Sequence, residues 1–125
     1  MNGRAWLFSA RRAWRRKSLR GLTIATCLLL AGASGYYWWN VLPSARSTGT
    51  VVLHYNIYFG IDDVRSAPWV LFLPAVWILC TLGGIAWGYA SYHQDPTFAD
   101  SLIAFAFFWS LPWVAALFYL TLVNR

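Results

Sequence analysis

The sequence predicts an all-α integral membrane protein with three transmembrane helices and a short β-like segment outside the membrane. Hydrophobic residues make up 59% of the 125-residue chain and charged residues only 11%, whereas about a quarter of the residues of a soluble domain are charged. Three uncharged apolar stretches are each long enough to cross a hydrocarbon core as a helix, which takes about 20 residues. Nine Trp, seven Tyr and eight Phe also suit a chain that meets lipid headgroups.

Residues 1–20 form a basic tail that we expect on the cytoplasmic side. The tail holds seven of the ten basic residues, and a positive flank before a first span is usual at the cytoplasmic face. Apolar side chains stand among these cations, namely Trp6, Leu7, Trp14 and Leu19. The mixture suggests a segment that lies on an anionic membrane face. Nucleic-acid binding through the tail is a rival hypothesis, which we rank last.

Residues 21–41 form the first predicted transmembrane helix. Four consecutive aromatic residues at 36–39 are typical of the opposite membrane interface, and Pro43 is expected to end the helix soon afterwards. A cleaved signal peptide with a site near residues 31–33 is the alternative interpretation. The aromatic belt that follows this site favours a retained span.

Residues 42–67 form the one long loop, which is extracytoplasmic in this topology, and a strand is predicted within it over residues 50–59. Apolar residues occupy every second position of this strand: Val51, Leu53, Tyr55, Ile57 and Phe59. His54 and Asn56 lie on the other face, which is the pattern of a half-buried strand. The sequence shows no second strand to pair with it. We therefore predict a partner chain, bound through the last four of these apolar residues.

The same loop contains a small group of polar residues that could form a site: His54, Asp62, Asp63 and Arg65. A lone His on the polar face of a strand is more often a surface residue than a ligand, and turn chemistry explains the two acids. No nucleophile motif, phosphate loop or paired cysteine spacing accompanies the group. We therefore assign no catalytic residue and no metal ligand, and keep this group only as an alternative site.

Residues 68–92 form the second predicted transmembrane helix, with a kink expected at Pro74. Gly84 and Gly88 make a Gly-x-x-x-Gly pair next to Gly83. Small residues at this spacing let the backbone of another helix approach closely. We predict helix packing at these three glycines, within the chain or in a homo-oligomer, and we expect the neighbouring Ile85 to face lipid.

Residues 93–100 form a short cytoplasmic turn, and residues 101–123 form the third predicted transmembrane helix. Two helix starts are possible: Asp95 as N-cap before Pro96, or a capping box of Thr97 and Asp100. In either case the acidic residues have a structural role at the start of the helix. Three crossings place the N-terminus in the cytoplasm and the C-terminus outside.

None of the three spans contains Asp, Glu, Lys, Arg or His. A proton relay, a charged substrate path or a haem held by an intramembrane His would need such residues. Cys27 and Cys80 lie on different helices and fall short of a four-ligand metal site. We therefore predict no cofactor and doubt that the protein is an enzyme in its own right.

The phrase His54-Tyr-Asn-Ile-Tyr-Phe-Gly-Ile-Asp62 resembles a loop of uncharacterised small multi-span membrane proteins from uncultured bacteria. In that family a similar phrase stands between the first and second spans. The likeness covers about nine residues and the order of the spans. It implies the same topology and marks the loop as the distinctive part, but it implies no substrate or cofactor.

Together these observations predict a structural or accessory interaction subunit of a membrane complex in the bacterial inner membrane. Its expected partners are the lipid bilayer and a membrane protein or a second copy of the chain. The alternative is a small enzyme or carrier that works at the outer leaflet through His54, Asp62 and Asp63. Convergence of these side chains around a pocket would favour the alternative.

Overall fold

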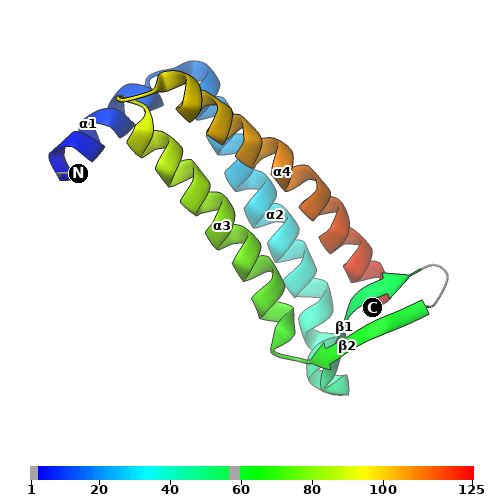
Figure 1. Ribbon diagram of the computed structural model, residues 1–125. Helices are drawn as coiled ribbons and strands as arrows, with labels where there is room; N and C mark the ends of the chain where they lie inside the picture. The colour runs from blue at the N-terminus through cyan, green and yellow to red at the C-terminus, as the bar shows by residue number, and fades with distance from the viewer. Residues whose placement is uncertain (1–2, 57–59) are drawn as a thin grey trace.

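The structure is a computed structural model that describes residues 3–56 and 60–125, with side chains described for residues 5–54 and 63–125. These residues form four helices and two strands along the chain (Figure 1). Their bounds are α1 Gly3–Trp14, α2 Lys17–Thr48, β1 Thr50–Asn56, β2 Gly60–Ser66, α3 Trp69–Ser91 and α4 Pro96–Val123.

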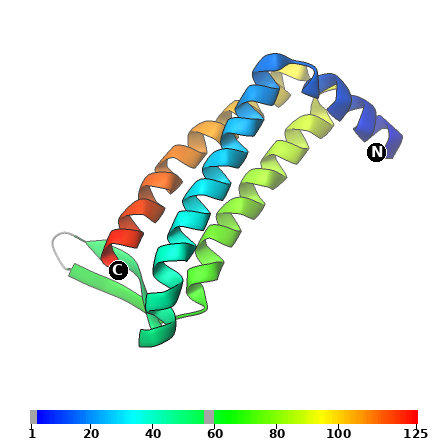
Figure 2. The same cartoon turned by 180° about the vertical axis from the view of Figure 1, so that it is seen from behind.

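Helices α2, α3 and α4 run side by side as a bundle, with α1 across one end and the hairpin of β1 and β2 at the other (Figures 1 and 2). Each of the three bundle helices is long and apolar enough to cross a membrane. The expected fold class is therefore confirmed, and the chain is a small multi-pass membrane protein. Fewer than a third of the residues in the most apolar window of each span are buried within the chain, which suits a bundle with lipid around it.

Helix α2 is longer at both ends than the span predicted over residues 21–41. The expectation that Pro43 ends the helix is wrong, because Pro43 lies inside α2. The helix continues to bury Ala45, which is 2% exposed and belongs to the core. It ends at Gly49, whose φ of 74° is left-handed and whose N–H donates to the Ala45 carbonyl. Glycine adopts that conformation without steric cost, which makes it a common helix terminator.

The core consists of two clusters, one toward each end of the bundle. The cluster near the hairpin is centred on Trp77, which is 1% exposed and stacks on Trp113 with 6.1 Å between ring centroids. The cluster near α1 joins Ala13 of α1 to Ile103 of α4 and to Ile85. Ile85 was expected to face lipid, and this expectation is wrong, since it is 6% exposed.

The loop contains two strands where the sequence indicated one over residues 50–59. Strands β1 and β2 pair antiparallel, with Val52 opposite Val64 and His54 opposite Asp63, and the register shifts on both sides of His54. The second strand was missed because its Gly and two Asp are poor strand formers, so pairing with β1 outweighs local preference. The inference that the first strand lacks a partner in its own chain is therefore wrong.

The turn between α3 and α4 follows the first of the two predicted helix starts. Asp95 is the N-cap, and its Oδ1 accepts from the Phe98 N–H at 2.9 Å. Pro96 occupies the first helical position, where its missing N–H costs nothing. Asp100 makes no capping hydrogen bond and instead pairs with Arg16.

Candidate functional site

Helix α1 is fixed to the end of the bundle by one buried serine. The Tyr89 and Ala90 carbonyls share the proton of the Ser9 hydroxyl, at 2.8 and 3.0 Å from its oxygen, and that oxygen accepts from the His93 N–H at 2.9 Å. These groups belong to the C-terminal end of α3, where helix carbonyls lack intrahelical donors. Ala13 lies one helical turn further along α1 and is fully buried. The two small side chains let α1 lie directly on the end of α3.

An ion pair closes the same end of the molecule. Arg16 Nη1 lies 2.7 Å from Asp100 Oδ2 and 3.5 Å from the Tyr92 hydroxyl. The hydrogen bond to Tyr92 and the charge of Asp100 raise the pKa of Arg16. Because Arg16 and Asp100 remain partly exposed, the pair positions the start of α2 over α4 more than it stabilises the fold.

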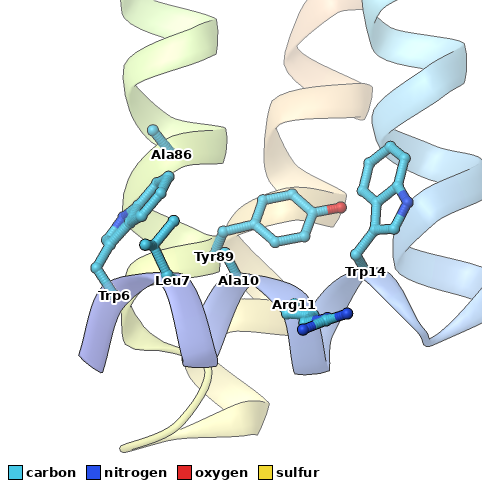
Figure 3. A pocket seen from close by; sticks show the side chains of 7 residues that line it. All are labelled: Trp6, Leu7, Ala10, Arg11, Trp14, Ala86 and Tyr89. Atoms are coloured by element: carbon cyan, nitrogen blue, oxygen red, sulfur yellow. The ribbon is translucent and has the colours of Figure 1, made fainter. Parts of the chain in front are cut away.

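The outward surface of α1 combines aromatic and basic side chains. Trp6, Leu7 and Trp14 are exposed and line an open apolar groove together with Ala10, Arg11, Ala86 and Tyr89 (Figure 3). Arg11 also lines a neighbouring hollow with Phe8, Arg12 and Arg15. We call the first hollow the α1 groove and the four residues of the second the basic hollow.

The opposite end is held by Asn124, which binds the backbone of β1. Its Oδ1 accepts from the Val52 N–H at 2.7 Å and its Nδ2 donates to the Val52 carbonyl at 2.8 Å. The carboxamide thus takes the place of a neighbouring strand at this edge. Arg125 adds bonds to the Tyr36 hydroxyl at 2.9 Å and to Asn40 Oδ1 at 3.0 Å. The end of α4 therefore joins the hairpin to α2.

The polar residues predicted from the loop come together only in part. Arg65 Nε binds Asp63 Oδ1 at 2.7 Å, and the Arg65 guanidinium lies 5.6 Å from the Trp69 ring centroid. His54 is exposed and lies opposite Asp63 in the ladder. Asp62 lies outside the described side chains. Within the described residues, no group of three or more His, Cys, Asp or Glu could hold a metal ion.

The structure describes the side chains of only the first part of the apolar face predicted for the first strand. Val51 is 1% exposed and belongs to the core, and Leu53 packs against the same cluster. Tyr55, Ile57 and Phe59 lie outside the described side chains. The start of β1 thus uses its apolar face to cover the bundle of its own chain.

The three glycines of α3 differ in their surroundings. A Cβ added at Gly88 would lie 2.9 Å from Ile103 Cγ1 of α4, closer than two carbon atoms pack. A Cβ added at Gly83 or Gly84 would meet nothing within 4 Å. Within this chain, the close approach of α3 and α4 therefore occurs at Gly88.

Comparisons with protein-family models, with curated proteins and with solved structures found no match. The family suggested by the loop phrase is thus not identified in this way. The structure itself supports the coarser statement, a small multi-span membrane protein with three apolar candidate spans.

Sequence reasoning missed the residues that hold the two ends together, chiefly Ser9, Asp100 and Asn124. For Ser9 and Ala13 a signal was present, because two small residues four apart on an amphipathic helix indicate a close helix contact. For Asn124 no local signal exists, since its partner Val52 is 72 residues away.

Proposed function

We propose that this protein is a structural or accessory interaction subunit of a membrane complex, and that β2 is the element that recognises the partner chain. The observation that carries the proposal is the unequal state of the two hairpin edges. The edge of β1 that faces away from β2 is occupied at Val52 by Asn124, whereas no hydrogen bond among the described residues covers the corresponding edge of β2 at Val64.

The ladder indicates which backbone groups of β2 point away from β1 and are open to a partner. In an antiparallel pair, two opposite residues either exchange both backbone bonds or direct both sets of groups away from each other. Val52 directs its N–H and carbonyl at Asn124, so the opposite Val64 directs its own toward the outer edge. The Val64 side chain is 52% exposed. An apolar residue on an open strand edge suits strand addition by another chain.

Further contacts belong to the same proposal. The remaining candidates for partner binding are Tyr55, Ile57 and Phe59. Leu53 is partly buried against the core of its own chain. Gly83 and Gly84 would admit the backbone of a second copy or of a partner helix. We expect a partner that is itself a membrane protein with an exposed strand at the same membrane face.

The distribution of basic residues supports a membrane orientation that suits this arrangement. Seven of the ten cations lie within residues 1–20, and the other three, Arg46, Arg65 and Arg125, lie at the hairpin end. We propose that the α1 end faces the cytoplasm of a bacterial inner membrane and that the hairpin and the C-terminal residue lie outside.

Affinity purification in mild detergent tests the proposal with one pair of variants. Val64→Pro removes the outward N–H and should abolish co-purification of the partner, whereas Val64→Thr keeps the N–H and the branched side chain and should retain it. Hydrogen exchange at the Val51 amide, which lies opposite Arg65 in the β1–β2 ladder, checks that the hairpin of each variant is intact. Equal yields of the same co-purifying protein with Val64→Pro and with the parent chain would contradict the proposal.

A small enzyme or carrier at the outer leaflet is the second candidate, favoured by the Asp63–Arg65 pair beside His54. The discriminating variant is His54→Ala, compared in cells that lack the parent gene. If the protein is an interaction subunit, its function in these cells should be unchanged by His54→Ala. Loss of function with unchanged expression, stability and co-purification would instead support the outer-leaflet site.

A further inference from the structure

We propose that the α1 groove binds one anionic glycerophospholipid, with an acyl chain between α1 and α3 and the phosphate at Arg11. The groove has a volume of about 600 Å³, within the range of known ligand sites. Its walls are apolar apart from Arg11, and Figure 3 shows Trp6 and Leu7 reaching from α1 along α3 toward Ala86. The groove thus runs beside the spans, where hydrocarbon chains lie.

Within the described residues, no ion pair joins Arg11, Arg12 or Arg15 to an acidic side chain. The chain contains only four acids. Asp95 caps α4 and Asp100 binds Arg16, while Asp62 and Asp63 lie on β2 at the opposite end of the bundle (Figure 1). Arg11, Arg12 and Arg15 of the basic hollow therefore present an unneutralised positive surface at the level of the headgroups. A phosphate is the anion that this level of a membrane supplies.

The groove is preformed, because α1 does not depend on the ligand for its position. The three Ser9 hydrogen bonds and the buried Ala13 hold α1 to the α3–α4 end. A ligand then binds without the cost of ordering a loose helix.

A phospholipid is the occupant that satisfies both halves of the site. An acidic peptide or a nucleic acid would pair with the arginines but would leave the aromatic wall unused. An uncharged lipid would fill the wall but leave the arginines unpaired. In a bilayer, an anionic lipid has its tail at the depth of the apolar wall and its phosphate at the depth of Arg11.

Native mass spectrometry of the purified full chain tests the site, with phosphatidylglycerol and phosphatidylcholine of identical acyl chains as probes. Both lipids carry a phosphate, but the choline of phosphatidylcholine adds a cation beside Arg11, Arg12 and Arg15, so we expect preferential retention of phosphatidylglycerol. Arg11→Gln should lower that retention by about tenfold, the effect of losing one charge-assisted hydrogen bond, whereas Arg11→Lys should keep most of it. Trp6→Ala should lower retention of both lipids, because it removes a wall of the groove.

Matched variants at the hairpin end serve as controls. Arg46→Gln removes an exposed cation and Trp39→Ala removes a tryptophan that is 84% exposed, and neither should change lipid retention. Circular dichroism and melting in detergent verify that each variant is folded, with Trp6→Leu as the substitute if Trp6→Ala is not. Equal retention of the two lipids, or equal losses with Arg11→Gln and Arg46→Gln, would overturn the proposal.

Discussion

At the scale of single residues, small side chains decide where helices meet. Gly88 lies where the backbone of α3 comes closest to Ile103 of α4, and Gly84, one turn away, faces no atom within 4 Å. The Gly-x-x-x-Gly spacing predicts helix packing at Gly83, Gly84 and Gly88, whereas within this chain the close contact is at Gly88. The spacing alone does not single out that glycine, because the contact depends on where the neighbouring helix crosses.

Gly88→Ala should therefore destabilise the bundle by about 1–3 kcal/mol, the usual cost of overpacking a filled contact. The free energy of unfolding in mixed micelles measures it. Gly84→Ala is the control, and it should be neutral because the added methyl group meets open space. Equal effects of the two substitutions would place the contact elsewhere.

Ser9 is the second decisive residue, since its single hydroxyl proton is shared by two carbonyls at the end of α3 and its oxygen accepts from the His93 N–H. Ser9→Ala should cost about 1–3 kcal/mol, because three backbone groups lose their partner. It should also speed hydrogen exchange at the His93 amide. Ser18→Ala, at an exposed position on the other side of the bend, should change neither quantity.

At the scale of elements, the hairpin differs most from what the sequence indicates. The apolar alternation correctly predicts β1 and the burial of Val51. It says nothing of β2, whose residues Gly60, Asp62 and Asp63 read as a turn. Strand pairing and the Asn124 contact are long-range interactions, so no local pattern carries them.

Asn124→Ala should loosen the edge of β1 without unfolding the bundle. Val52 loses both backbone partners, so the free energy of local opening should fall by about 1–2 kcal/mol. Hydrogen exchange at the Val52 amide reports this opening. Asn124→Asp keeps the acceptor for the Val52 N–H but sets a carboxylate oxygen against the Val52 and Leu120 carbonyls, so it should loosen the edge as well. Unchanged exchange at the Val52 amide in both variants would refute the clamp.

At the scale of the whole molecule, composition and uncharged spans were sufficient to predict three helices that can cross a membrane. The sequence of the α3–α4 turn offered the Asp95 cap as one of two possible helix starts, and α4 uses it. Composition and the uncharged spans did not predict that residues 3–14 form a helix packed on the bundle end, because a basic amphipathic segment is equally consistent with a free tail. The docking depends on Tyr89, Ala90 and His93, some 80 residues away.

The central claim is a three-span chain with α1 on the cytoplasmic face and the hairpin outside. Cysteine labelling of intact cells tests it most directly, in a background that lacks Cys27 and Cys80. Suitable single cysteines replace Gln94, in the α3–α4 turn, and Ser47, beside the hairpin, since both positions are exposed. An impermeant reagent should label the Ser47→Cys chain and leave the Gln94→Cys chain unlabelled until the membrane is opened. Labelling of both positions from outside, or of Gln94→Cys alone, would contradict the account.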